Sequence, residues 1–147
     1  MSTWYGSLTN RLEEGRNLLD REIRPGDDIT MYMWSDRYCY YVTQVESEKR
    51  LHVKPYSVCA DKSKPGGMGH QNWVYFKTLK EKSEYLGLEV PPGESLEAHD
   101  AASEEVWVFR YRKWKQEVRN PDGSVFYIDL PGKITFGLRD YYYDWEF

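Results

Sequence analysis

The sequence has few of the residues that build metal centres, disulfide frameworks or membrane spans. It contains two cysteines and three histidines among 147 residues, and Cys39 and Cys59 have no metal-type spacing. No secretion signal precedes the charged N-terminal segment, so we expect reduced thiols in a cytoplasmic protein. No apolar run approaches the ~20 residues that a membrane-spanning helix needs. We therefore expect no metal, no cofactor and no membrane partner.

The chain also lacks the short motifs that mark common enzymes and nucleotide-binding folds. In the glycine-rich loop at residues 65–69, Gly69 is followed by His70 and Gln71, where a P-loop needs lysine and serine or threonine. A dinucleotide-binding fingerprint fails at Asn72, which takes the place of its third glycine. No Gly-x-Ser-x-Gly nucleophile elbow occurs. No catalytic residue is predicted, and a binding protein is favoured over an enzyme of unrecognised type.

The charge balance and the length restrict the class of partner. A net charge of −4 argues against a dedicated duplex-DNA binder, whose affinity comes mostly from basic residues on phosphates. A chain of this length suits one domain and no linker divides it, so we expect a single domain over 1–147. Six tryptophans, thirteen tyrosines and five phenylalanines make the chain rich in aromatic residues. Tyrosine suits both strands and half-wet recognition surfaces, so both interpretations of this surplus stay open.

Hydrophobic periodicity predicts a protein rich in antiparallel strands. Helical spacing predicts an N-terminal helix over 7–20 and an inserted helix over 78–86. Period-two patterns between turn residues predict strands over 29–34, 38–45, 51–58, 106–118, 125–130 and 134–138. In the fifth of these strands, we expect Phe126, Ile128 and Leu130 to face the core. The predicted fold class is α+β: a bent antiparallel sheet or a small SH3-like β-barrel that carries the two helices.

The most basic strand candidate contains a first candidate binding site. If residues 106–118 form one strand, Arg110, Arg112 and Trp114 share one face while the opposite face supplies core residues. Guanidinium groups bind phosphate or carboxylate through paired hydrogen bonds, and an indole can stack on a base. These three residues therefore suit a nucleotide-like ligand or an acidic partner. The alternative is a solvated face, neutralised by the acidic stretch at 94–105.

The C-terminal segment is the densest aromatic cluster of the chain. Five of the last seven residues are aromatic, and such side chains are costly to leave in water. We expect Tyr143 and Phe147 to pack into the body and Arg139 to pair with Asp140 or Asp144. The alternative is an aromatic and acidic surface for another protein, and the sequence favours neither.

Two segments far apart in the chain have distinctive patterns. One is the Ser-Asp-Arg turn that contains Asp36 and Arg37, which also suit an ion pair that fixes the turn. The other is the pattern Gly-x-Arg-Asp-x-Tyr-Tyr-Asp-x-x-Phe over 137–147, which contains Arg139 and Tyr142. Together they resemble a group of small bacteriophage and prophage proteins of no assigned role.

The resemblance implies a phage setting and no particular mechanism. Small phage proteins without virion or enzyme signatures often act against host systems, so we expect a binding protein that modulates or inhibits a host process. It would sequester a nucleotide-like ligand or block a host protein in the host cytoplasm, as an anti-defence protein does. A nucleic-acid-binding β-barrel module is the alternative, and homo-oligomerisation stays open. The candidate ligand-binding residues are Arg110, Arg112, Trp114, Asp36, Arg37, Arg139 and Tyr142.

Deletion of residues 141–147 distinguishes the two interpretations of the C-terminal segment. If the segment packs against the body, the truncated chain unfolds at a lower urea concentration, because buried aromatic area is lost. The midpoint of urea unfolding, followed by circular dichroism, measures this change. A soluble truncated chain with an unchanged midpoint would rule out the packing role.

Overall fold

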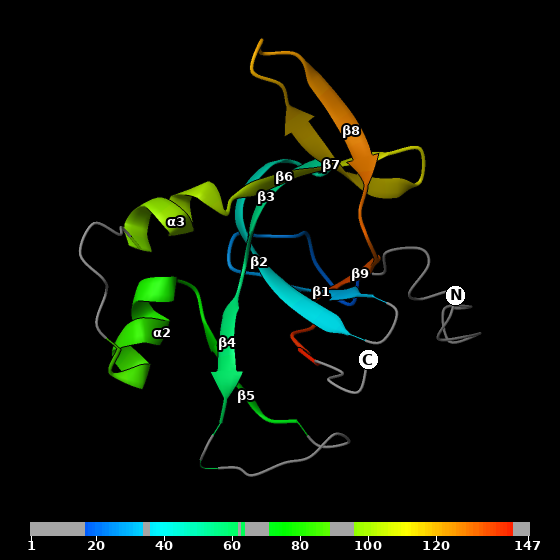
Figure 1. The fold of residues 1–147 in the computed structure, drawn as a ribbon. Coiled ribbons are helices and arrows are strands. Elements are labelled where there is room, and N and C mark those ends of the chain that lie inside the picture. The colour runs from blue at the N-terminus through cyan, green and yellow to red at the C-terminus, as the bar shows by residue number, and fades with distance from the viewer. Residues whose placement is uncertain (1–16, 34–35, 62, 64–70, 89–95, 143–147) are drawn as a thin grey trace.

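The fold is an open, bent sheet with a small second sheet and two short helices (Figure 1). A computed structural model describes residues 17–33, 36–61, 63, 71–88 and 96–142. The large sheet contains β1 (Asp28–Tyr32), β2 (Arg37–Ser47), β3 (Arg50–Pro55), β6 (Glu105–Arg110), β7 (Lys113–Arg119), β8 (Val125–Asp129) and β9 (Lys133–Phe136). The other elements are β4 (Ser57–Ala60), β5 (Trp73–Phe76), α2 (Leu79–Leu86) and α3 (Leu96–Ala102). The strand order is β8-β7-β6-β3-β2-β1-β9, and β4 pairs with β5; all these pairings are antiparallel.

The α+β fold class and the inserted helix are confirmed. The Thr78 hydroxyl caps the start of α2, since it accepts a hydrogen bond from the Glu81 N–H at 3.1 Å. The helix ends at Gly87, which adopts a left-handed conformation with φ 69° and donates its N–H to the Glu84 carbonyl. Both ends of this helix are therefore set by local chemistry that the sequence displays.

The expected N-terminal helix falls mostly outside the described residues, and the described strands do not close into a barrel. Residues 1–16 lie outside the described residues, and residues 17–20 are not helical. The N–H of Leu18 instead donates to the Phe136 carbonyl at 2.9 Å, so this segment lies along the outer edge of β9. Among the described strands, β8 and β9 are the two edges of the large sheet and do not pair, so the sheet is bent but open (Figure 1).

One face of the bent sheet encloses the core. Trp107 on β6 is fully buried at its centre, and its indole N–H donates to Glu105 Oε2 at 2.9 Å. Every strand of the large sheet except β8 contributes to this cluster of buried side chains. Its other members are Ile29, Met31, Val42, Leu51, Val53, Trp114, Ile134 and Phe136.

β1 and β2 are buried on both faces, so the face opposite the core is also covered by other parts of the chain. Val42 belongs to the core, whereas Cys39 and Tyr41, also buried, point to the opposite side of β2. There the Tyr41 ring lies 4.9 Å from the ring of Tyr56, next to β4. Thr30 on β1 is fully buried on the same second side, 3.8 Å from the Cys39 sulfur.

The predicted single strand over 106–118 is wrong, because the chain reverses in its middle. β6 and β7 form a hairpin whose turn contains Tyr111 and Arg112, both at positive φ (52° and 71°). Two consecutive left-handed residues make the tight turn that suits the twist of paired strands. Phe109 and Trp114 therefore face each other across the hairpin, and Trp114 is buried in the core.

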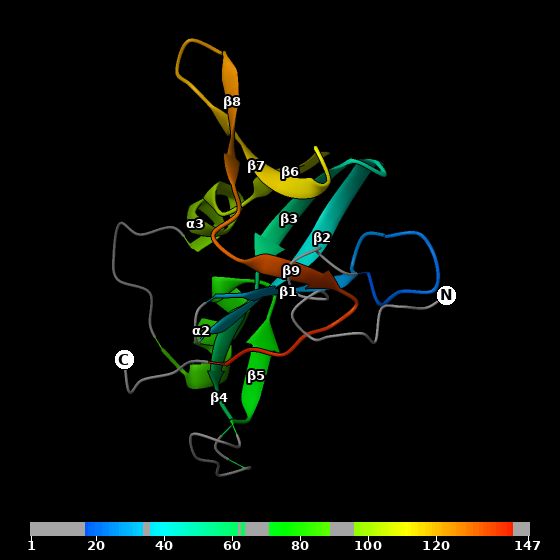
Figure 2. The ribbon, with the colours of Figure 1, turned by 90° about the vertical axis from the view of Figure 1, so that its right-hand side faces the viewer.

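The prediction that β8 faces the core is correct only at its end. Phe126 and Ile128 lie on the same side of the sheet as Trp114, but 42% and 43% of their surfaces are exposed. Leu130, just beyond the strand, does pack against the core. Figure 2 explains the difference: the hairpin of β7 and β8 extends beyond the body, so its far half has nothing beneath it among the described residues.

Replacement of Trp107 by alanine tests the position of the core. Because the side chain is 0% exposed, Trp107→Ala leaves a large cavity and lowers the free energy of unfolding by about 3–5 kcal/mol. Tyr111, which is 96% exposed, is the matched control, and Tyr111→Ala changes the same free energy by less than about 0.5 kcal/mol. Urea unfolding followed by tyrosine fluorescence compares the two variants. Equal losses would contradict this assignment of the core.

Candidate functional site

The Ser-Asp-Arg turn and the C-terminal pattern meet in space. Backbone hydrogen bonds join Arg37 and Tyr142 in both directions, with N···O distances of 2.8 and 3.1 Å. The Arg37 guanidinium lies 4.9 Å from the centre of the Tyr142 ring, and it forms an ion pair with Asp140 at 3.5 Å. The residues Asp36 and Arg37 and the described end of the chain at 140–142 therefore make one structural unit at the start of β2.

A buried hydroxyl fixes the C-terminal segment to β1. Thr30 Oγ1 donates to the Leu138 carbonyl at 2.7 Å and accepts the Asp140 N–H at 3.1 Å. Because Thr30 is fully buried, both bonds are shielded from competing water. They hold the backbone on either side of Arg139, whose side chain is thereby directed away from β1 toward the second sheet.

The Arg139 guanidinium lies over two tyrosine rings, those of Tyr75 on β5 and of Tyr56 just before β4. Its guanidinium carbon lies 4.4 Å from the ring centre of Tyr75 and 5.4 Å from that of Tyr56. The expected pairing with Asp140 is replaced, because Asp140 turns to Arg37. Asp144, the other expected partner, lies outside the described residues.

The aromatic residues of the C-terminal segment dock as far as they are described. The Tyr141 ring packs edge-on against Trp73 at 4.7 Å and against Tyr38 at 5.9 Å between ring centres. Its backbone N–H donates to the Tyr75 hydroxyl at 2.8 Å. The packing interpretation is thus supported for Tyr141 and Tyr142, whereas residues 143–147, including Tyr143 and Phe147, lie outside the described residues.

These contacts form two clusters around the crossing segment, Arg37 with Tyr142 and Arg139 with Tyr56 and Tyr75, and we call them together the arginine–tyrosine surface. Burial raises the pKa of Tyr75 to about 12. Burial, together with a hydrogen bond from its hydroxyl to Asp28, raises the pKa of Tyr56 even further. Both phenols therefore stay neutral near pH 7, and the guanidinium groups supply the positive charge of the surface.

Arg37 has a donor that its neighbours do not use. Its Nε atom is buried and has no hydrogen-bond acceptor among the described residues. A buried donor without an acceptor costs free energy, about 1–3 kcal/mol in typical proteins. An acceptor brought by a ligand would remove that cost. Asp36, the neighbouring predicted residue, accepts a hydrogen bond from the Tyr38 hydroxyl at 3.3 Å.

The structure does not gather the other three predicted site residues into one place. Arg110 stacks over the Tyr127 ring at 4.6 Å, and Arg112 is exposed in the hairpin turn. Trp114 is buried, and it lines a recess of about 320 Å³ together with Phe109 and Phe136. Because the chain turns at residues 111 and 112, these three side chains cannot act as one binding face.

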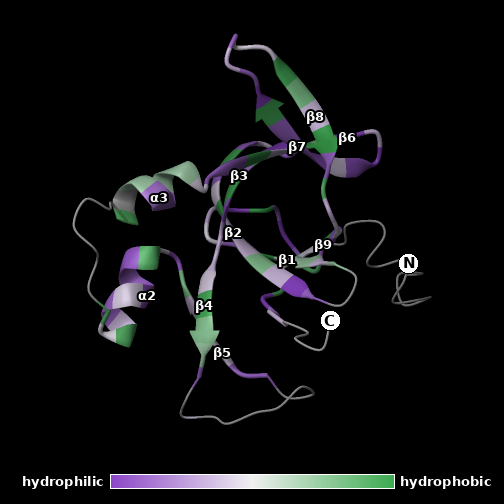
Figure 3. Cartoon of the chain, viewed as in Figure 1, coloured by the Kyte–Doolittle hydropathy of each residue, from purple (hydrophilic) through white to green (hydrophobic). Residues whose placement is uncertain are grey.

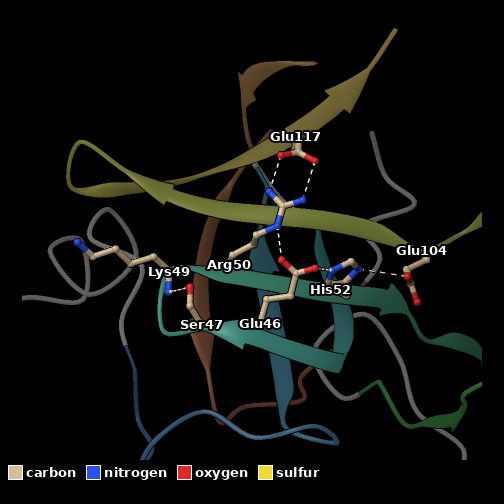
Figure 4. Close-up of polar contacts among 7 residues, drawn as sticks. All are labelled: Glu46, Ser47, Lys49, Arg50, His52, Glu104 and Glu117. Atoms are coloured by element: carbon tan, nitrogen blue, oxygen red, sulfur yellow. Dashed lines mark hydrogen bonds and ion pairs between the residues drawn. The ribbon is translucent and has the colours of Figure 1, made fainter. Parts of the chain in front are cut away.

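A chain of charged side chains crosses the solvent face of the large sheet (Figure 4). Arg50 donates through Nη1 and Nη2 to both Glu117 oxygens at 2.5 and 3.0 Å, and through Nε to Glu46 at 2.5 Å. His52 lies between two carboxylates, 2.6 Å from Glu46 and 3.3 Å from Glu104. Sequence reasoning missed this network, although Arg50 and His52 alternate with the core residue Leu51 along β3.

We assign this network to stabilisation of the sheet. A histidine between glutamates can in principle move protons, but Glu46 is already paired with both Arg50 and His52. Hydrogen bonds from His52 and Arg50 lower the pKa of Glu46, and the hydrogen bond from Arg50 lowers the pKa of Glu117. Such carboxylates hold their negative charge near pH 7 and are occupied by neighbours, so they serve poorly as general bases.

The described residues form no metal centre, and comparison with known proteins shows no match. The described residues contain no group of three or more histidine, cysteine, aspartate or glutamate side chains that could hold a metal ion. None of the helices in the described ranges has the length and apolar character to cross a membrane. Comparison of the chain with protein-family models, with curated proteins and with solved structures found no match.

Replacement of Glu117 by glutamine tests the charged network. The side chain is 7% exposed, so Glu117→Gln lowers the free energy of unfolding at pH 7 by about 1–3 kcal/mol. The pKa of Glu117 is lower in the folded than in the unfolded chain, so the stabilisation exists above the unfolded pKa of about 4.3 and disappears as the pH falls below it. Urea unfolding of the parent and of Glu117→Gln from pH 7 to pH 3 measures the difference between their free energies of unfolding.

The exposed Glu84 on α2 provides the control for that experiment. Glu84→Gln removes the same charge from a residue outside the network, and we expect a change of less than about 0.5 kcal/mol at any pH. A gap between the parent and Glu117→Gln that stays constant down to pH 3 would show that the Arg50–Glu117 ion pair contributes nothing.

Proposed function

We propose that this chain is a non-enzymatic binding protein that takes a phosphate- or carboxylate-bearing ligand, such as a nucleotide, at the arginine–tyrosine surface. The observation that carries the proposal is the pair of guanidinium groups, Arg37 and Arg139, each held against tyrosine rings. Contact with an aromatic ring orders a guanidinium without occupying all five of its N–H donors, because the ring attracts the cation as a whole. An ordered guanidinium binds an anion with a smaller loss of conformational entropy than a free one.

The biological setting follows from the resemblance and extends the same proposal. A small phage-type protein with such a surface would act in the host cytoplasm, where it would sequester a nucleotide signal or cover an acidic site on a host protein. Arg37 and Tyr142, the two residues that join the similar segments, belong to the proposed surface. The proposal therefore gives these segments a common role, which is to build one anion-binding face.

The nucleic-acid module that the sequence leaves open has less support than a small ligand. Recognition of a nucleic acid strand uses several cations along a groove. Here Arg37 is partly neutralised by Asp140, and the protein has a net charge of −4. An enzyme of unrecognised type would need a general acid or base, and the strongest candidate, His52, belongs to the charged network, where it contacts Glu46 and Glu104.

Paired double variants test the proposed surface. The tagged protein is expressed in a bacterial host, and mass spectrometry identifies nucleotides that are released when the purified protein is denatured. Calorimetric titration with the released nucleotide then compares the parent with Arg37→Ala/Arg139→Ala. We expect the affinity to fall about 100-fold, because two charge-assisted interactions are lost.

The control variant is Arg110→Ala/Arg112→Ala, which removes the same charge from the other predicted arginines. We expect it to retain the affinity of the parent, and circular dichroism confirms that each variant is folded. Equal affinities of the parent and of Arg37→Ala/Arg139→Ala would overturn the proposed site. Weaker binding by the control alone would return the site to the turn between β6 and β7. A purified protein that releases no nucleotide and binds none from a panel of nucleoside phosphates and cyclic dinucleotides would overturn the nucleotide proposal.

A further inference from the structure

β8 is an edge strand whose side chains and backbone are open to solvent. Val125, Phe126 and Ile128 are exposed hydrophobic residues, and most of the strand is hydrophobic (Figure 3). Its pairing with β7 is regular, without a bulge, from Val125 to Asp129. Within the described part of the chain, no strand pairs with its other side. An exposed, regular and hydrophobic edge is a template for another strand.

The opposite edge of the sheet, at β9, is covered by another segment of the chain. The outer side of β9 carries the segment at residues 17 and 18, whose Leu18 N–H bonds to the Phe136 carbonyl. Pro131 and Lys133 also lie at the start of β9, and both residue types discourage strand addition. β8 has neither a covering segment among the described residues nor a proline or lysine within it.

The hydrogen-bond pattern identifies which backbone groups of β8 are available. At the β7–β8 turn, the Asn120 N–H donates to the Ser124 carbonyl at 2.8 Å. Bonded and non-bonded pairs alternate along an antiparallel ladder, so Phe126 and Ile128 bond to β7. The N–H and C=O groups of Val125, Tyr127 and Asp129 then point to the free edge. They form a row of donors and acceptors that a second strand could complete.

We propose that the partner of this edge is β8 of a second copy of the chain, in an antiparallel pair with its two-fold axis at Tyr127. In this register Tyr127 faces Tyr127 of the second copy, and Val125 faces Asp129. All three residues with outward backbone groups then lie in hydrogen-bonded pairs, as the ladder requires. A two-fold interface needs a surface that is complementary to itself, and the five-residue strand meets this condition about its middle residue.

The side chains also match in this register. Phe126 lies opposite Ile128 of the second copy, in the pairs where side chains approach most closely, so two Phe–Ile contacts form beside the two-fold axis. Asp129, the single charged residue of β8, lies opposite an uncharged valine. Its charge is already balanced by Lys113 at 3.1 Å and Lys115 at 3.3 Å within its own chain. No like charges in the two strands oppose each other.

Sedimentation velocity over a range of concentrations tests the dimer. The parent protein is expected to shift from monomer to dimer as its concentration rises. Phe126→Lys/Ile128→Lys places lysines opposite each other in both pairs and is expected to raise the dimer dissociation constant about 100-fold. Both residues are already exposed, so the monomer should remain folded. The control is Leu88→Lys/Tyr111→Lys, which changes two other exposed hydrophobic residues and should dimerise like the parent.

A cysteine cross-link tests the register in a chain that carries Cys59→Ser. Tyr127→Cys places two cysteines in a directly opposed pair, with Cα atoms about 5.5 Å apart, which is within the range of a disulfide. Phe126→Cys places them roughly 8 Å apart, which is too far. Oxidation should therefore give a covalent dimer with Tyr127→Cys and none with Phe126→Cys.

Two results would overturn the proposal. A parent protein that remains monomeric up to about 1 mM would exclude self-pairing at any useful affinity. A dimer whose dissociation constant is unchanged by Phe126→Lys/Ile128→Lys, or that cross-links more readily through Phe126→Cys, would place the interface elsewhere. The arginine–tyrosine surface is not involved, so Arg37→Ala/Arg139→Ala should leave the dimer intact.

Discussion

The face of the sheet opposite the core depends on the two hydrogen bonds that the Thr30 hydroxyl makes. A residue at this place in β1 must fill a fully buried position and satisfy two backbone groups of the segment that crosses it, the Leu138 carbonyl and the Asp140 N–H. Serine, alanine and valine each meet one of these demands only in part, since they lack volume or the hydroxyl. With the crossing segment fixed, Arg139 can reach only the tyrosine rings beside β4 and β5. The position of the candidate site is therefore a consequence of how β1 is covered.

The sequence predicts those parts of this fold whose signals are local. The inserted helix carries its own cap in Thr78 and its own stop in Gly87, and β1 and β2 follow from alternation between turns. The strand predicted over 51–58 instead divides at Tyr56 into β3 and β4, which belong to different sheets. The β6–β7 hairpin was missed because its turn contains Tyr111 and Arg112, which rarely adopt the left-handed conformation that the turn requires. Nothing in the local sequence marks that turn. The alternating pattern continues through it, so the two strands look like one.

The sequence identified individual residues of the candidate site, but it did not show which of them lie together in the fold. Arg37 and Tyr142 were selected from two separate patterns, and only the pairing of distant segments brings them together. Arg110, Arg112 and Trp114 were selected because a continuous strand would align them, so the turn that divides the strand also divides the group. The exposure of Phe126 on β8 also depends on the arrangement of distant segments. Phe126 faces the expected side of the sheet, but whether a hydrophobic side chain is buried depends on how far the body extends beneath it.

Arginine is used in two ways on the face of the sheet opposite the core, once among carboxylates and once among tyrosine rings. Arg50 directs its Nε and both terminal nitrogens to Glu46 and Glu117, so its hydrogen-bonding capacity serves the sheet itself. Arg139 lies over the rings of Tyr75 and Tyr56 and also hydrogen-bonds to Tyr56, and it forms no ion pair with a carboxylate among the described residues. Arg37 is intermediate, with one ion pair, one ring contact and one buried donor that finds no acceptor among the described residues. Loss of Arg50 removes three hydrogen bonds to carboxylates within the sheet, whereas loss of Arg139 removes two ring contacts and a hydrogen bond to Tyr56.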